Sequence, residues 1–166
     1  MIDRILKALM SFIIGAMALL YLAHNIANVG AAFDFFTYTT SHADQAAYPV
    51  TLLPVAPAWA IVIAMALVFA LEGAAAAACI YGGFVLFFLR AADDEAFEAG
   101  KKWAKIGLGC AIANWWGLFQ VIAIAGYQLW QMPLGTGPDH GSWQYGAMAA
   151  ISLIYLSLPV ARPAAD

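Results

Sequence analysis

Three polar side chains lie inside long apolar stretches, where such groups are rare. Glu72 is near the middle of the apolar run at residues 58–89, and Asn114 and Gln120 lie in the run at residues 106–130. If the two runs form antiparallel membrane helices, the three side chains reach a comparable depth. A carboxyl group at that depth is costly and usually faces protein or water, which suits a proton or ligand site. The alternative is a hydrogen-bonded carboxyl that fixes helix packing.

A second polar group lies near the end of the first apolar run, at residues 8–29. It consists of His24, Asn25 and Asn28, with Tyr21 three residues before the histidine. His24 and Asn28 are four residues apart and share a helix face. We expect these side chains to form hydrogen bonds between helices. Because no second histidine lies in an apolar run, haem ligation would require a haem shared with another subunit.

The remaining candidates for chemistry show no motif. Five potential metal ligands fall between the apolar runs without a defined spacing, and we interpret them as solvated loop residues: Asp34, His42, Asp44, Asp139 and His140. Cys79 and Cys110 lie within apolar runs, where a thiol behaves as a small hydrophobic group. The sequence also lacks phosphate-binding and nucleophile motifs. We therefore predict no catalytic residue, no metal and no cofactor, with bound lipid expected and a quinone or shared haem as alternatives.

The composition defines the environment in which these residues must work. Of 166 residues, 64% are hydrophobic and only 10% are charged. Soluble domains are roughly half apolar and about a quarter charged, so a soluble domain is excluded. The net charge of −3, from 7 basic and 10 acidic residues, argues against nucleic-acid binding. The chain is expected to be one integral membrane domain, residues 1–166.

Four apolar runs are candidates for membrane helices, since about 20 apolar residues cross a bilayer. They are residues 8–29, 58–89, 106–130 and 143–158. Proline and glycine clusters before the second run and before the fourth mark breaks between them. The expected fold is therefore an all-α, polytopic bundle of four transmembrane helices. Its outer loops are residues 30–57 and 131–142, and its cytoplasmic loop is residues 90–105.

The distribution of basic residues predicts the orientation. All seven lie before the first run, in the middle loop or in the tail: Arg4, Lys7, Arg90, Lys101, Lys102, Lys105 and Arg162. The positive-inside rule then places both termini and the middle loop in the cytoplasm. Four tryptophans near the ends of runs are expected to anchor the helices at the membrane interface: Trp59, Trp103, Trp130 and Trp143.

Short motifs across nearly the whole chain resemble one family. They are Asn25-Ile26-Ala27-Asn28, the central acid Glu72, Phe97 followed by Lys101-Lys102, Trp116-x-x-Phe119, and Leu129-Trp130-Gln131. Together they are similar to the bacterial small integral membrane proteins of domain-of-unknown-function family 2165. Two positions depart from the family pattern, Ala125-Gly126-Tyr127 in place of Glu-Trp-Phe and Ala43-Asp44 in place of Met-Asp. The resemblance implies a four-helix protein of the bacterial inner membrane and supplies no activity.

The sequence favours a non-catalytic accessory or assembly subunit of a larger membrane complex, plausibly respiratory or photosynthetic. Small residues at 73–78 suit close packing against other membrane subunits. Two alternatives use Glu72. One is a small proton-coupled transporter, and the other is a membrane enzyme or quinone-site protein.

Overall fold

The computed structural model describes residues 1–160, so Arg162 and the rest of the tail lie outside the described residues. All regular elements in residues 1–160 are helical, as expected from the continuous apolar runs. In order they are α1 (Ile2–Ala27), α2 (Val29–Thr40), α3 (Ala58–Phe88), η1 (Leu89–Ala91), α4 (Asp94–Gly100), α5 (Lys102–Ile112), η2 (Ala113–Gly126), η3 (Leu129–Gln131) and α6 (Thr136–Ser157). Inside a bilayer a helix satisfies its own backbone hydrogen bonds, so this outcome follows from composition.

Three helical stretches are long and apolar enough to cross a membrane. They are Ile2–Ala27, Ala58–Ala91 and Asp94–Gly126, the last combining α4, α5 and η2. The fourth long helix, α6, has 22 residues and is more polar near its start, where Asp139 lies in the first turn. The chain is therefore an all-helical protein with three candidate membrane spans.

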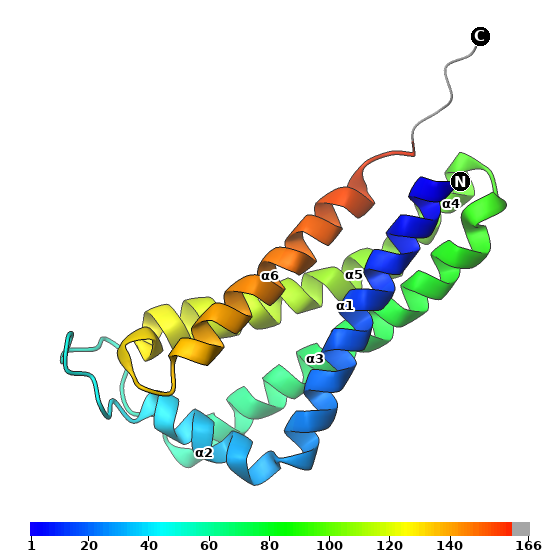
Figure 1. The fold of residues 1–166 in the computed structure, drawn as a ribbon. Coiled ribbons are helices and arrows are strands. Elements are labelled where there is room, and N and C mark those ends of the chain that lie inside the picture. The colour runs from blue at the N-terminus through cyan, green and yellow to red at the C-terminus, as the bar shows by residue number, and fades with distance from the viewer. Residues whose placement is uncertain (161–166) are drawn as a thin grey trace.

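The long helices form a bundle that opens toward one end (Figure 1). Helices α1 and α3 lie side by side, α5 packs against α3, and α6 packs against α5 and η2. The N-terminus, the turn around α4 and the end of α6 share one end of the bundle, here called the N-terminal end. Helix α2 crosses the opposite end, here called the α2 end.

Small residues bring α1, α3 and α5 into close contact. Gly82 on α3 lies directly against the backbone of Ala104, and a Cβ built on Gly107 would lie 2.5 Å from Cys79 Sγ. On the other side of α3, Ser11 Oγ donates a hydrogen bond of 2.7 Å to the carbonyl oxygen of Cys79. Close backbone approach maximises van der Waals contact, which stabilises helix pairs where lipid removes the hydrophobic driving force.

A buried polar network joins the helices at the N-terminal end. Lys7 and Lys101 are each 1% exposed, and their Nζ atoms both donate to the carbonyl oxygen of Leu158, at 2.6 and 2.9 Å. Lys101 also pairs with Glu98 at 2.6 Å, and Lys7 pairs with Asp3 at 3.2 Å. Two cations thus lie where the C-terminus of α6 carries partial negative charge.

Arg4 makes a second connection in the same network. Its guanidinium donates to the carbonyl oxygen of Ala92 and to Asp94 Oδ1, both at 2.5 Å, and lies over the Phe97 ring. These contacts tie α1 to the start of α4, where Asp93 accepts the N–H of Ala96 as the helix cap. Arg4, Lys7 and Lys101, three of the basic residues used to predict the orientation, therefore also hold the bundle together.

The segments between the expected spans contain helices of their own. The first part of residues 30–57 is α2, α6 begins within residues 131–142, and α4 and the start of α5 occupy much of residues 90–105. Helix α2 packs against α3, and its Phe35 packs against the cluster of buried side chains that contains Ile124 and Leu129, contacts that a pattern search for spans does not consider. Where the sequence indicated loops at residues 30–57 and 131–142, the structure therefore has parts of two helices.

Candidate ligand-binding site

A cavity of about 490 Å³ lies toward the α2 end of the bundle. Residues of α1, α2, α3, η2 and α6 line it, so five elements that are distant in sequence converge there. Most of its surface is apolar, and a small number of polar groups face it, as is typical of small-molecule sites. This cavity is the candidate functional site.

Glu72 supplies the cavity with its carboxyl group. Its side chain is 2% exposed, and Nδ2 of Asn25 donates to both carboxyl oxygens, at 3.1 Å to Oε1 and 2.9 Å to Oε2. The contact joins α3 to α1 and orients the carboxyl group. A carboxylate offers about four acceptor positions, so the Asn25 amide leaves acceptor capacity for a ligand.

Three aromatic rings from three helices gather in the wall of the same cavity. Tyr21 of α1 lies 4.9 Å from Tyr145 of α6 and 6.0 Å from Trp115 of η2, and Tyr145 lies 5.6 Å from Trp115, measured between ring centroids. The two tyrosine hydroxyls are hydrogen-bonded to each other. The rings meet largely edge to face, the arrangement that aromatic quadrupoles favour.

A second, more apolar cavity of about 190 Å³ adjoins the first. The two share the side chains of Phe35, Phe36, Val68 and Phe119 in their walls. The smaller cavity, here called the apolar slot, continues between α2, α3 and η2 past Ala64 and Ala123. The site therefore combines a chamber containing a carboxyl group with an adjacent apolar cavity.

The other two members of the expected intramembrane cluster make no hydrogen bond to the Asn25–Glu72 pair. Asn114 is fully buried, and neither its side-chain nitrogen nor its oxygen has a hydrogen-bond partner among the described residues. Gln120 donates to Ser142 Oγ at 2.8 Å and to the carbonyl oxygen of Asp139 at 2.9 Å. Gln120 thus joins η2 to the start of α6, and Ser142 in turn lines the cavity.

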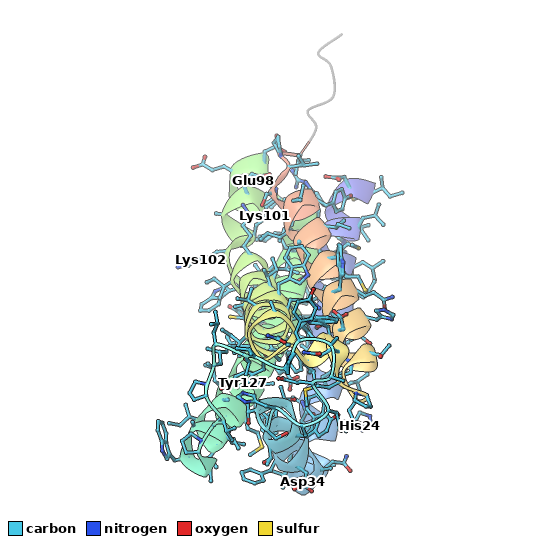
Figure 2. The ribbon with its side chains drawn as sticks, turned by 90° about the vertical axis from the view of Figure 1, so that its left-hand side faces the viewer. His24, Asp34, Glu98, Lys101, Lys102 and Tyr127 are labelled. Carbon is cyan, nitrogen blue, oxygen red and sulfur yellow. The ribbon has the colours of Figure 1, made fainter. Side chains whose placement is uncertain are left out.

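The polar residues expected to share a face of the first span make different contacts. Asn25 contacts Glu72, whereas Asn28 donates to the carbonyl oxygen of His24 at 2.8 Å, where α1 ends and α2 begins. His24 is exposed and borders the cavity. Figure 2 shows His24, Asp34 and Tyr127 toward the α2 end, with Glu98, Lys101 and Lys102 at the other. The residues with candidate chemistry and the charged network therefore occupy opposite ends.

The remaining predicted residues lie on the surface or in the connections. Trp59, Trp103, Trp130 and Trp143 are all exposed, which is compatible with contact with lipid. No three His, Cys, Asp or Glu side chains gather as a metal site within residues 1–160. Cys79 is buried in the core and Cys110 is half-buried.

Sequence reasoning did not place Trp115 or Tyr145 in the site, and it did not pair Asn25 with Glu72. The signal for that pair is that both residues are polar positions in the first two apolar runs, which pack side by side as antiparallel helices. Tyr145 carries no comparable signal, since its polar tip meets Tyr21 only in the folded bundle.

Fold and site together define a helical integral membrane protein with a cavity that contains a buried carboxyl group. The sequence model of the family described as predicted small integral membrane protein, DUF2165, matches residues 3–159. The chain belongs to this family. No curated protein and no solved structure matches it.

Proposed function

We propose that the protein binds a small ligand in the cavity beside Glu72. The single observation that carries this proposal is the buried carboxyl group in the wall of a mostly apolar chamber. Burying such a group is costly, and its common use in membranes is to bind ions, protons or substrates. Binding of this kind is shared by the carrier and the quinone-site alternatives that the sequence raised.

Extraction of bound small molecules tests this proposal. The protein would be purified in native-lipid nanodiscs, and its organic extract would be compared by mass spectrometry with that of Glu72→Gln. Glu95→Gln is the matched control, because it removes the same charge from an exposed position at the N-terminal end. We expect a species that is present in the wild type and Glu95→Gln and depleted in Glu72→Gln. Identical extracts from all three proteins would refute ligand binding at Glu72.

A role as an accessory or assembly subunit is a second proposal. A surface groove on α1 and α3 favours it, because Gly73 and Ala77 are among the residues that line it and small residues allow a partner helix to approach closely. Gentle extraction through a C-terminal tag tests it by the mass and composition of the product. Defined co-purifying membrane subunits would support this role, and a particle containing this chain alone would exclude it.

We further propose that α6 is a fourth crossing, with both termini in the cytoplasm of a bacterial inner membrane. Its 22 residues correspond to about 33 Å at a rise of 1.5 Å each, enough to cross the hydrocarbon core. The contacts of Leu158 with Lys7 and Lys101 bring its end level with the N-terminal end of the bundle. The basic residues near that end favour the cytoplasmic side.

A further inference from the structure

We propose that the ligand of the Glu72 cavity is an amphipathic organic cation, whose ammonium group pairs with Glu72 and whose apolar tail occupies the apolar slot. This inference rests on the proposed function and names its ligand class. Three features of the site carry it.

The first feature is the charge of the chamber. Among the described residues that line it, Glu72 is the single carboxyl group, His24 is the single imidazole, and neither lysine nor arginine contributes. The six described Lys and Arg side chains lie in 4–7 and 90–105, toward the N-terminal end. An anionic ligand would therefore face Glu72 without a basic partner, whereas a cation would meet a carboxyl group of opposite charge.

The second feature is the aromatic wall. Tyr21, Trp115 and Tyr145 form a contiguous group of rings, and all three line the chamber with Glu72. Aromatic rings attract organic cations through their quadrupoles, and several rings beside one carboxyl group are a common way to recognise an ammonium group.

The third feature is the apolar slot. It shares Phe35, Phe36 and Phe119 with the chamber, so the slot lies directly beside the space in which a ligand head would meet Glu72. Tail burial in the slot would remove alkyl surface from water, which favours a ligand with an alkyl or aryl extension. The carboxyl group and aromatic rings of the chamber, together with the apolar slot, indicate an amphipathic cation.

Isothermal titration with three hexyl compounds tests the charge of the head group. The protein would be held in phosphatidylcholine nanodiscs, with empty nanodiscs as the blank. The ligands are hexyltrimethylammonium, hexanol and hexanoate, which share a tail and differ in charge. We expect saturable binding of the cation and at least about tenfold weaker binding of the other two.

Variants of Glu72 assign the binding to the carboxyl group. Glu72→Gln should weaken hexyltrimethylammonium binding about tenfold or more, whereas Glu72→Asp and the control Glu95→Gln should retain it. If Glu72→Gln does not fold, the comparison of the three compounds on the wild-type protein still tests whether the site prefers a cation. Equal or tighter binding of hexanol or hexanoate would overturn the cation assignment and leave the proposed ligand site intact. No saturable binding of any compound would overturn the cation assignment, and the extract comparison would then judge ligand binding independently.

A substitution in the apolar slot tests the place of the tail. Ala64 lines the slot and not the chamber, so Ala64→Leu should obstruct the tail alone. We expect weaker binding of hexyltrimethylammonium and unchanged binding of tetramethylammonium, which has no tail. Unchanged binding of both cations would overturn the assignment of the slot.

Discussion

Gly82 lies where another helix occupies the space that a side chain would need. A Cβ at this position would contact the Ala104 backbone, with the Ala104 Cα only 2.7 Å away. Gly109, on α5, has no atom of another element within 4 Å of the corresponding position. The two glycines therefore differ in environment although the sequence presents both within apolar runs.

This difference predicts opposite effects for the same substitution. Gly82→Ala should lower the free energy of unfolding by about 1–3 kcal/mol, because α3 and α5 must move apart. Gly109→Ala should raise it by up to about 1 kcal/mol, since alanine is the better helix former. Thermal unfolding of both variants in detergent measures these changes in stability. Equal effects would contradict the packing of Gly82 against Ala104.

At the scale of elements, the N-terminal end is held by charges that meet a helix C-terminus. Lys101 is 1% exposed and donates to both Glu98 and the carbonyl oxygen of Leu158, whereas the next residue, Lys102, is exposed. One lysine thus joins α5 to the end of α6, and its neighbour faces outward. Helix α5 begins here and is followed directly by η2, which contributes Trp115 to the wall of the cavity.

Substitution of the buried Lys101 and of the exposed Lys102 provides a matched test of the polar network at the N-terminal end. Lys101→Met should lower the free energy of unfolding by about 1–3 kcal/mol, because Glu98 and the end of α6 lose a charged donor. Lys102→Met should change it by less than about 0.5 kcal/mol. Thermal unfolding of each variant in detergent is the measurement. A neutral Lys101→Met would show that the α6 end is held by other contacts.

At the scale of the whole molecule, the proposed four crossings predict which residues an impermeant reagent can reach. Ala43→Cys and His140→Cys lie at the α2 end, and Glu95→Cys and Leu158→Cys lie at the N-terminal end; all four native residues are exposed. In intact cells we expect an impermeant maleimide to label the first two alone. Permeabilised cells should show labelling of all four.

The parent chain controls for the native cysteines, of which Cys79 is buried and Cys110 half-buried. Labelling of Glu95→Cys in intact cells would reverse the orientation. Labelling of both His140→Cys and Leu158→Cys in intact cells would show that α6 does not cross.

The sequence by itself determined the class of protein, the helical fold and the family. Long continuous apolar runs have one stable outcome in a bilayer, so composition and length sufficed to place a helix at Ala58–Phe88 and an acid at its centre. The motifs around Asn25, Glu72 and Trp116 sufficed to identify the family, because they are local.

Only the tertiary structure decided which side chains meet. Glu72 contacts Asn25 because α1 packs beside α3, and Tyr145 reaches Tyr21 because α6 returns along the bundle. Helix α2 lies beside the site because it packs against α3 and its Phe35 packs against the cluster that contains Ile124 and Leu129. Such contacts depend on how each helix is rotated and which helices are its neighbours. Close packing at small residues such as Gly82 sets both, and the hydropathy of the sequence does not encode either.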